Sequence, residues 1–445
     1  MRVVVLGLGQ YPKGSGIVTA LFVAKRGDEV IVVEPHYTPA MDENIKRLNA
    51  FSNVQVITGD IKPAAVLKGV ELVIRHQRLR RDEPVLVVAR RAGIPIETEL
   101  SLFLKQCPAV VIGVTGTRGK STTTALIHEI LTASRKWHKV WLAGNILASP
   151  LLDLVKMKAN DIVVLEMSSF QLEGTGDGGV SPQIAVWTNL MRDHLNVYPD
   201  MEEYAEAKAQ IFRHQQMNDL VFLPQEKAFD DYASQAPSDV YRFGKKGSEE
   251  RKLVQSVALK LRGTHNQLNA EIATAVALQL DIPVSVVKRA LRAFIGLPNR
   301  QQEVAVIKGV HYINDTTATT PDATMTALQT FATQGRIHLI VGGADKELVF
   351  DEVAGSVKRL AASVMLLPGT AHEKIVAAFT KKRVRYQDVA DMQEAVEQIQ
   401  GLVQNGDYVL LSPGCASFGL FQNEYHRGQI FVRSVQRLQR TTKRK

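Results

Sequence analysis

Residues 114–130 read VTGTRGKSTTTALIHEI, with glycines, a lysine and hydroxyl residues between a strand-like run and an amphipathic helical pattern. Gly116 and Gly119 permit a tight turn and the close backbone approach that a phosphate requires. The following helix directs free N–H groups and the positive end of its dipole at this loop. Lys120 is placed to reach the β- and γ-phosphates of a nucleotide, and Ser121 is placed to face Mg²⁺. The segment therefore predicts a phosphate-binding loop.

This loop departs from the strict G-x-x-x-x-G-K-[ST] pattern, because Val114 occupies the first glycine position. A strand, a turn and a helix with chance glycines would give similar letters. The intact GKST sequence and the apolar stripe that follows it favour a phosphate loop at a strand–helix junction. The stripe consists of Leu126, Ile127, Ile130 and Leu131.

Candidate metal ligands follow two other strand-like runs. Glu166 ends the run DIVVLE, and His194 comes shortly after the run IAVWTNL. In open α/β sheets, ligands gather at the carboxyl ends of the strands. The hydroxyl of Ser121, the carboxylate of Glu166 and the imidazole of His194 could therefore share one Mg²⁺ site. Without the phosphate loop, Glu166 would fit a salt-bridge partner and His194 a capped loop residue.

Lys208 falls on the apolar stripe of a predicted helix. In MEEYAEAKAQIF, the residues Tyr204, Lys208, Ile211 and Phe212 recur at i, i+4, i+7 and i+8. A lysine in this position commonly extends its amine to water. Alternatively, the amine is desolvated and its pKa is lowered. A neutral amine reacts with CO₂ to give a carbamate, which is an anionic metal ligand. The spacing alone leaves both interpretations open.

Parallel sheets must position these residues. Short β-branched runs alternate with helical patterns along most of the chain, which is typical of parallel strands with crossover helices. The runs are RVVVLGLG, EVIVVE, VQVITG, ELVIR, AVVIGVTG, VWLAGN, DIVVLEMSS, IAVWTNL, HYINDT, IHLIVGG, VMLLPG and YVLLSPG. We predict an α/β protein of three domains, at residues 1–106, 107–298 and 299–445. The outer domains are expected to be Rossmann-like, and the central domain to hold a parallel sheet like that of P-loop ATPases.

Composition narrows the class of partner. The net charge is +9 and the pI is near 9.3, which suits anionic small substrates as well as nucleic acid. The sequence contains no zinc-finger spacing and no aromatic–basic interleaving, so we expect no nucleic-acid partner. No apolar run approaches the roughly 20 residues of a membrane helix. Cys107 and Cys415 are the only cysteines, too few for a disulfide framework. We expect a cytoplasmic monomer without a membrane contact.

An ordered set of motifs resembles the Mur ligase family over nearly the whole chain, most strongly at residues 108–320. The motifs are TGTRGKST, LEMSSFQLE, DHLNVYPDMEEYAEAKAQIF, GTHNQLN, GLPNRQQE, NDTTAT, GGADK and LLSPGCASFGLF. SSFQLE is most similar to the member that adds D-glutamate. The resemblance implies an ATP-dependent ligase of peptidoglycan synthesis that joins D-glutamate to UDP-N-acetylmuramoyl-L-alanine. The substrate carboxylate would become an acyl phosphate, from which the amine of D-glutamate displaces phosphate.

The resemblance also implies a role for each residue that matches a motif. The implied ATP contacts are Gly116, Thr117, Gly119, Lys120, Ser121, Thr122, Asn266, Asn269, Arg300 and Asp315. The implied ligands of one Mg²⁺ are Ser121 and Glu166, and those of a second Mg²⁺ are His194 and a carbamylated Lys208, with or without Glu166. The expected catalytic residues are Lys120, Glu166, His194 and Lys208. The implied substrate contacts are Asn145, Ser168, Lys346, Ser417 and Phe418. The three domains would bind the UDP substrate, ATP and the amino acid in that order.

The first domain departs from the family pattern. The loop GLGQYPKGSG is longer than usual, and RHQRL replaces the usual SPGIP segment. Glu34 stands where an acidic residue is expected after the second strand, but Pro35 and His36 follow it. The basic residues are Arg75, His76, Arg78, Arg80 and Arg81. They either bind the diphosphate of the substrate or form a solvated face.

The third domain departs as well. Thr317 replaces the family lysine in NDTTAT, and Glu347 and Val349 stand where a glycine and an aspartate are usual. Gly419 replaces an expected aspartate. Losing one cation and gaining Glu347 weakens the electrostatic case for a dicarboxylate amino acid. A Mur-type ligase for a different amino acid therefore remains an alternative.

Two alternatives come from other functional classes. The N-terminal GLG with Glu34 could belong to a dinucleotide-binding oxidoreductase. That interpretation leaves GKST and the HN-x-x-N pattern at His265–Asn269 unexplained. A non-catalytic protein that binds a partner would keep folded domains but release no phosphate.

Overall fold

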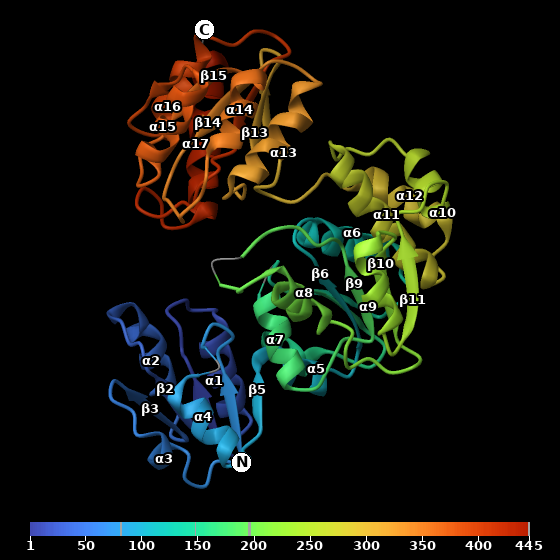
Figure 1. Cartoon of the computed structure of the whole chain (residues 1–445), viewed down its shortest axis with the longest axis vertical. Helices are drawn as coiled ribbons and strands as arrows, with labels where there is room; N and C mark the ends of the chain where they lie inside the picture. Colours follow the sequence, from blue (N-terminus) through green and yellow to red (C-terminus); the bar gives the residue numbers. More distant parts are fainter. Residues whose placement is uncertain (81, 147, 195–196, 444–445) are drawn as a thin grey trace. The chain divides into compact units, whose positions relative to one another are not determined.

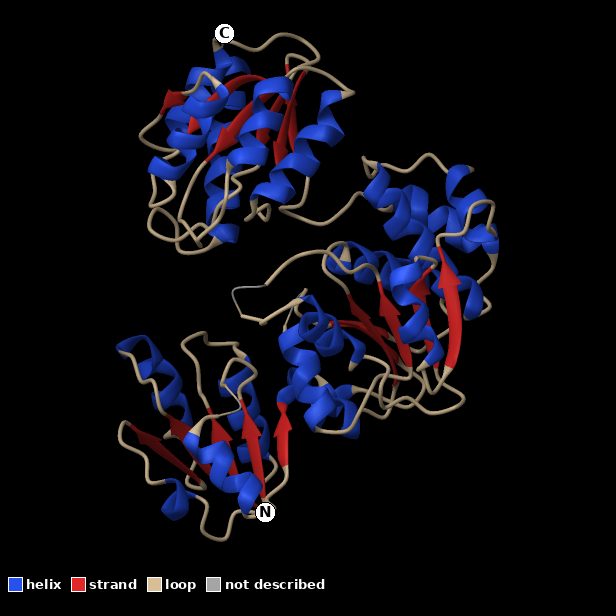
Figure 2. Ribbon diagram, viewed as in Figure 1, coloured by secondary structure: helices blue, strands red, loops and turns tan. Residues whose placement is uncertain are grey.

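The computed structural model describes residues 1–80, 82–146, 148–194 and 197–443. Its strands form three separate sheets, each with its own surrounding helices (Figures 1 and 2). The chain divides into two compact units: Met1–Leu259 with His265–Phe294, and Lys260–Thr264 with Ile295–Lys445. The first unit holds two sheets and the second unit holds the third. The residue boundaries predicted for three domains stay a prediction.

The first sheet is wholly parallel, with strand order β3-β2-β1-β4-β5. Alternate residues of β1 point to opposite faces, as the period of a strand requires. Val3 and Val5 pack with residues of α1, whereas Val4 and Leu6 pack with residues of α4. Helices therefore cover both faces, which explains the nearly continuous apolar runs in the sequence. The strands are β1 (Arg2–Leu6), β2 (Glu29–Glu34), β3 (Val54–Thr58), β4 (Leu72–Arg75) and β5 (Ile96–Thr98), and the helices are α1 (Ser15–Lys25), α2 (Asp42–Leu48), α3 (Pro63–Val66), α4 (Pro84–Arg91) and α5 (Glu99–Gln106).

The second sheet is also wholly parallel, with strand order β11-β10-β9-β6-β8-β7. Its strands are β6 (Val110–Thr115), β7 (Val140–Gly144), β8 (Ile162–Glu166), β9 (Ile184–Trp187), β10 (Leu220–Pro224) and β11 (Asp239–Phe243). Its helices are α6 (Lys120–Ser134), α7 (Ser169–Asp177), α8 (Met201–Ala209), α9 (Asp230–Ser234), α10 (Glu249–Gln255), α11 (Thr264–Gln279) and α12 (Val284–Ala293). The carboxyl ends of β7, β8, β6 and β9 lie side by side in that order.

The third sheet has strand order β12-β13-β17-β14-β15-β16. Its strands are β12 (Gln302–Ile307), β13 (Val310–Asn314), β14 (Ile337–Val341), β15 (Ala361–Leu366), β16 (Gln387–Asp388) and β17 (Tyr408–Leu411). The helices are α13 (Pro321–Ala332), α14 (Asp351–Leu360), α15 (His372–Lys382), α16 (Met392–Gln400) and α17 (Glu424–Lys443). Leu339 and Val341 pack toward α13, α14 and α15, whereas Ile340 packs toward α16 and α17.

The predicted α/β class with three domains is confirmed, and each strand-like run that the sequence singled out forms a strand. The strands β5, β10, β11 and β16 were not predicted, and neither was the edge strand β12. It pairs antiparallel with β13 through a turn at Lys308 and Gly309, both with positive φ, at 51° and 75°. Two successive positive φ values fit the tight hairpin turns that join antiparallel strands.

Candidate active site

The loop between β6 and α6 has the backbone of a phosphate site. Gly116 has φ 147° and Gly119 has φ 79°, conformations that favour glycine. An added Cβ would lie 1.9 Å from Thr188 Oγ1 at Gly116 and 2.3 Å from Asn269 Oδ1 at Gly119. Both glycines are therefore required by their surroundings as well as by their φ angles. The stripe Leu126, Ile127, Ile130 and Leu131 is fully buried, as predicted.

Lys120 begins α6 and folds back over the loop. Its Nζ donates to the carbonyls of Gly116 and Thr117 at 3.1 and 3.2 Å. Ser121 and Thr117 are buried beside it, and Thr122 is half-buried in the first turn of the helix. The loop thus combines a lysine with the N-terminus of a helix, two features that favour anion binding.

The neighbouring strand β9 supports the loop through two residues that sequence reasoning did not single out. The side chain of Asn189 accepts from Arg118 N–H at 2.9 Å and donates to Arg118 O at 3.0 Å. The Thr188 hydroxyl donates to the same carbonyl at 2.7 Å. Thr188 and Asn189 directly follow a strand, which is a position where site residues are expected. Among the residues after this strand, only His194 was chosen as a candidate on that ground.

Glu166 ends β8, in register with Val114 of β6 and Gly144 of β7. The residue is 2% exposed, and its Oε2 is buried without a hydrogen-bond partner. Its Oε1 accepts from Asn145 Nδ2 at 3.3 Å, and Asn145 N–H donates to Glu166 O at 3.0 Å. A buried carboxylate oxygen without a donor fits a cation, so the donor set suits Mg²⁺. Among the described residues, no group of three His, Cys, Asp or Glu gathers as a metal site. The predicted ligands include only two residues of those four types.

Lys208 is fully buried, and its Nζ donates to Gly116 O at 2.9 Å. The predicted stripe is buried throughout, although α8 ends at Ala209, so Ile211 and Phe212 lie in the turns after it. The Nζ lies 4.5 Å from the centroid of the Tyr204 ring. Burial and the nearby charge of Lys120 lower the pKa of Lys208 well below its ordinary value. Of the two interpretations of Lys208, the structure therefore supports the one in which the amine is desolvated and its pKa is lowered.

His194 lies in the segment after β9 with φ 56°. Its ring meets Phe170 edge-on at 5.4 Å and Tyr204 at 5.8 Å between centroids. Burial lowers the pKa of His194, and the charges of Lys208, Lys120 and Arg118 lower it further, against the opposing effect of Asp193. A neutral imidazole is the form that binds a metal.

The two asparagines of the HN-x-x-N pattern stand beside the phosphate loop. Asn269 Nδ2 donates to Asn266 Oδ1 at 3.0 Å, and Asn269 Oδ1 accepts from the Thr123 hydroxyl at 3.3 Å. Both residues are buried in α11. Ser168 instead caps α7, because its hydroxyl accepts from Gln171 N–H at 3.3 Å. Its predicted contact with substrate remains a prediction.

The second unit gathers the other predicted residues in two places. Asp315 Oδ1 accepts from Gln301 N–H at 3.1 Å, and Oδ2 accepts from the Ser412 hydroxyl at 3.0 Å. Burial raises the pKa of Asp315 to about 7, while these bonds and the charge of the exposed Arg300 oppose the rise. At the second place, Lys346 Nζ lies 5.7 Å from the centroid of the half-exposed Phe418 ring. Ser417 beside Phe418 is buried.

The basic segment of the first domain does not act as one group. Arg75 is buried, and its Nη2 pairs with Asp177 Oδ2 of α7 at 3.0 Å, so it cannot serve as a surface cation. Arg80 pairs with the exposed Asp82 at 3.0 Å. Burial and the charge of Arg78 lower the pKa of His76. Arg81 lies outside the described residues. The choice between diphosphate binding and a solvated face thus remains open only for the exposed arginines.

Glu34 is buried and fully engaged with backbone donors. Its Oε2 accepts from Leu8 N–H at 2.7 Å and Gly9 N–H at 3.3 Å, and its Oε1 accepts from His36 N–H at 2.9 Å. The carboxylate therefore fixes the glycine loop. This use argues against Glu34 as a ribose ligand of a dinucleotide, the role on which the oxidoreductase alternative depends.

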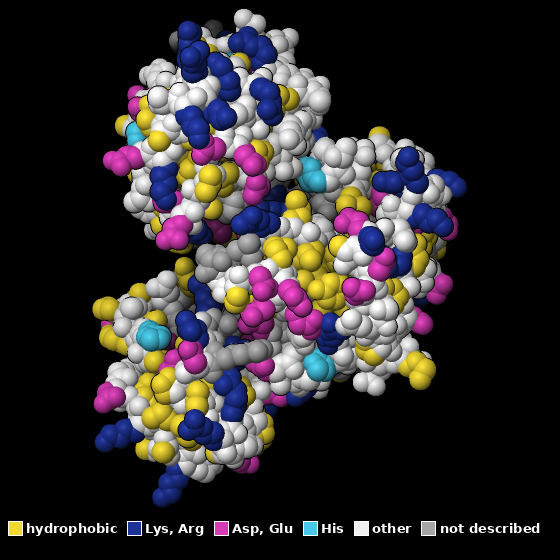
Figure 3. All heavy atoms as spheres, viewed as in Figure 1, with side chains coloured by type: hydrophobic (Ala, Val, Ile, Leu, Met, Phe, Trp, Pro, Cys, Tyr) yellow, Lys and Arg dark blue, Asp and Glu magenta, His cyan; other side chains and the backbone are white. Residues whose placement is uncertain are grey.

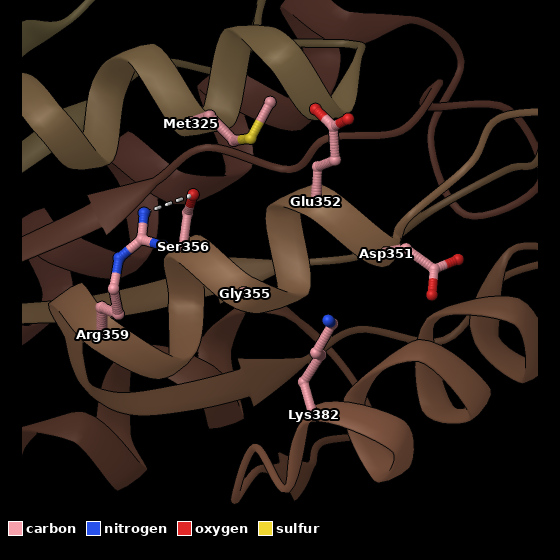
Figure 4. A pocket seen from close by; sticks show the side chains of 7 residues that line it. All are labelled: Met325, Asp351, Glu352, Gly355, Ser356, Arg359 and Lys382. Atoms are coloured by element: carbon pink, nitrogen blue, oxygen red, sulfur yellow. Dashed lines mark hydrogen bonds between the residues drawn. The ribbon is translucent and has the colours of Figure 1, made fainter.

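The lining of a shallow hollow on the second unit includes none of the predicted site residues. Figure 4 shows its lining, which comes from α13, α14 and α15. The lining residues are Met325, Asp351, Glu352, Gly355, Ser356, Arg359 and Lys382. On α14, Arg359 Nη2 donates to Ser356 Oγ at 3.4 Å.

The fold and the phosphate loop define a three-domain α/β protein built to hold a nucleotide. The Mur ligase middle domain matches residues 114–277, and the Mur ligase glutamate ligase domain matches residues 299–415. The UDP-N-acetylmuramoylalanine–D-glutamate ligase of Roseiflexus sp. (strain RS-1) is 35% identical over 98% of both chains. The ligase of the same name from Clostridium botulinum (strain Kyoto / Type A2) is 33% identical over 84% of each chain. The chain belongs to the Mur ligase family.

Solved structures agree on the fold. UDP-N-acetylmuramate-alanine ligase MurC from Thermotoga maritima has a TM-score of 0.59 and 22% identity, covering 98% of this chain and 100% of that one. MurF ligase from the same organism, solved with ADP, has a TM-score of 0.62 and 18% identity, covering 97% and 98%. Among the described residues, no helix is both long and apolar enough to cross a membrane.

Proposed function

We propose that this protein is the ATP-dependent ligase that joins D-glutamate to UDP-N-acetylmuramoyl-L-alanine in peptidoglycan synthesis. The observation that carries the proposal is the phosphate loop to which Lys120 and the buried Lys208 both donate, together with the buried carboxylate oxygen of Glu166 that lacks a hydrogen-bond partner. The name shared by the two curated relatives supplies the two substrates. The protein acts in the cytoplasm as a monomer.

The reaction divides into two displacements. A carboxylate oxygen of the UDP substrate attacks the γ-phosphorus of ATP, which forms an acyl phosphate and releases ADP. The amine of D-glutamate then attacks the acyl carbon, loses a proton and displaces inorganic phosphate. Because the charges crowd together in both steps, positioning and electrostatic stabilisation carry most of the catalysis.

The chain's own residues serve these steps. Lys120 and the N–H groups at the start of α6 hold the transferred phosphate, and Asn266 and Asn269 support the loop from the adenine side. Thr117 and Thr122 contact the phosphates. Asn145 and Ser168 touch the muramoyl substrate.

In the second unit, one group of residues contacts ATP and a different group binds the amino acid. Arg300 and Asp315 contact ATP, and Lys346, Ser417 and Phe418 bind the amino acid. Lys346 is exposed, so its ammonium is available to a carboxylate.

One Mg²⁺ would be held by Ser121 and Glu166, and a second by His194 and a carbamylated Lys208, with or without Glu166; both ions would neutralise phosphate charge. Three features support this set. Glu166 Oε2 lacks a donor, the pKa of His194 is lowered, and the pKa of Lys208 is lowered. The carbamate forms when the neutral amine attacks CO₂ and a proton leaves.

An amino-acid panel tests the proposal. The purified chain with ATP, Mg²⁺ and UDP-N-acetylmuramoyl-L-alanine should release phosphate only when D-glutamate is added. Release with another amino acid alone would favour the second candidate, a Mur-type ligase of different specificity. That candidate is favoured by Glu347, an exposed carboxylate with φ 59° directly after Lys346. No release with any amino acid would contradict both.

A further inference from the structure

Arg427 is a buried cation in the fourth position of α17, and no motif assigned it a role. Its side chain is among the largest fully buried side chains of the protein. All three guanidinium nitrogens donate. Nε bonds Thr316 Oγ1 at 3.0 Å, Nη2 bonds Thr316 O at 2.8 Å, and Nη1 bonds Cys415 O and Ala416 O at 3.1 and 3.2 Å.

Each of these acceptors is neutral. Among the residues that the structure describes, Arg427 forms no ion pair with a carboxylate. Burial lowers the pKa of Arg427 to about 10, so the side chain still carries its charge at neutral pH. The charge of Glu424, three residues earlier in α17, favours the protonated form of Arg427. A buried cation whose hydrogen-bond acceptors are all neutral is still costly, and neutral side chains could connect the loops at lower cost. Because the charge is kept despite the cost of burying it, we expect Arg427 to have a role beyond packing.

The bonds of Arg427 join the loops that leave two adjacent strands, β13 and β17, and the guanidinium lies close to the loop after a third strand, β14. β17 pairs with β13 on one side and β14 on the other, all parallel. Thr316 follows β13, and Cys415 and Ala416 follow β17. The loop after β14 is close as well, because a Cβ added at Gly343 would lie 3.2 Å from Nη1. These loops carry Asp315, Lys346, Ser417 and Phe418.

The contact with Ala416 has a directional consequence. In a planar trans peptide the C=O and the following N–H point in opposite directions. Because Ala416 O faces Arg427, the N–H of Ser417 points away from the guanidinium. That N–H finds no acceptor among the described residues, although Ser417 is 3% exposed. A neighbouring cation polarises the peptide and strengthens this donor.

We propose that Arg427 is a positioning residue for the amino-acid site. It fixes the loops after β13 and β17, and through the Ala416–Ser417 peptide it directs a strengthened N–H donor at a carboxylate of the substrate. This inference rests on the proposed function, since it assigns the loops of the second unit to amino-acid binding. It predicts that the charge of Arg427 favours an anionic amino acid over its neutral isostere.

The test compares two substitutions at Arg427 with a matched control. Arg427→Gln removes the charge, and Arg427→Lys keeps a charge but not the planar fork. Arg433→Gln removes one charge from an exposed position of the same helix. For each variant the KM for D-glutamate is compared with the inhibition constant of D-glutamine as a competitor, and thermal unfolding verifies the fold.

We expect Arg427→Gln to lose about tenfold or more of the selectivity for D-glutamate over D-glutamine. Arg427→Lys should retain most of the selectivity but turn over more slowly, and Arg433→Gln should match the unchanged protein. Equal losses for both ligands in Arg427→Gln would overturn the charge argument. Unchanged turnover in Arg427→Lys would overturn the positioning argument.

The proposal can still be judged after two other outcomes. If Arg427→Gln does not fold, Arg427→Lys decides alone, because lost selectivity in this charged variant contradicts the proposal. If the unchanged protein uses a different amino acid, the proposed function fails, and turnover of Arg427→Lys with that amino acid still decides the positioning argument.

Discussion

Lys208 Nζ donates to the carbonyl of Gly116 at 2.9 Å, across 92 residues of sequence. The bond connects the only buried lysine among the described residues to the first glycine of the phosphate loop. Burial and the charge of Lys120 both disfavour the ammonium form of Lys208. If this amine is carbamylated, as proposed, it becomes an anion within reach of the phosphate loop, and that anion would offset the charge of Lys120.

Replacing Lys208 by alanine should abolish ligation because it removes this anionic ligand. A short carboxylic acid such as acetate should restore part of the activity, since it can occupy the vacated space and supply the missing carboxylate. Phosphate release with and without acetate measures the effect. Lys158→Ala, at an exposed lysine of the same unit, should behave like the unchanged protein with or without acetate.

The carbamate itself is open to direct observation. Removing CO₂ from the buffer should lower the activity of the unchanged protein, and bicarbonate should restore it. Failure of acetate rescue, together with a ¹³C spectrum that lacks a carbamate signal in ¹³CO₂-saturated buffer, would contradict the assignment.

Lys120→Ala tests the phosphate loop. The lysine contacts two loop carbonyls at 3.1 and 3.2 Å, so its ammonium is held where the γ-phosphate must lie. We expect a loss of ligation of at least about a hundredfold, in line with removal of one preorganised electrostatic contact. The exposed Lys252→Ala serves as the control. Amino-acid-dependent phosphate release that survives in Lys120→Ala would show that the loop binds something other than the reacting phosphate.

Sequence patterns predicted the parts of the site that depend on local periodicity. Glycines followed by GKST, a carboxylate at a strand end and a lysine on an apolar stripe are local signals, and the structure places Glu166 and Lys208 accordingly. Patterns could not show which cations become buried by contacts between distant segments. Arg75 was grouped with its basic neighbours, yet it pairs with Asp177, which lies 102 residues away. Arg427 was not singled out from the sequence at all, because its partners lie 11 to 111 residues away.

The Arg75–Asp177 pair should respond asymmetrically to substitution. The side chain of Arg75 is 1% exposed, and that of Asp177 is 28% exposed. Asp177→Ala leaves a buried cation with a lost partner, which typically costs about 3–5 kcal/mol. Arg75→Met leaves a carboxylate that can be solvated and keeps the apolar volume, so about 1–2 kcal/mol is expected. Urea unfolding of the full chain measures both. An equal or larger loss in Arg75→Met would contradict the assigned burial.

The exposed arginines of the same segment allow a separate prediction. If Arg78 and Arg80 bind the diphosphate, the double change to glutamine should raise the KM for UDP-N-acetylmuramoyl-L-alanine and leave the KM for ATP unchanged. The change should not affect stability, because Arg80 pairs only on the surface. An unchanged KM for the UDP substrate would assign these arginines to the solvated face.

Asp315 should make the protein less stable as the pH rises, whereas most carboxylates make a folded protein more stable as the pH rises. Burial raises its pKa from 3.8 to about 7, so the folded second unit binds a proton there that the unfolded chain has released. Its contribution to stability is fully present below pH 4 and is lost as the pH rises through 7. The difference between the two pKa values corresponds to at most about 4 kcal/mol.

Asp315→Asn removes the titration, so its Tm should exceed that of the unchanged protein by several degrees at pH 8 and by little at pH 4. Hydrogen exchange of β13 and β17 would assign the transition to the second unit. A Tm difference that does not grow between pH 4 and pH 8 would contradict the raised pKa of Asp315.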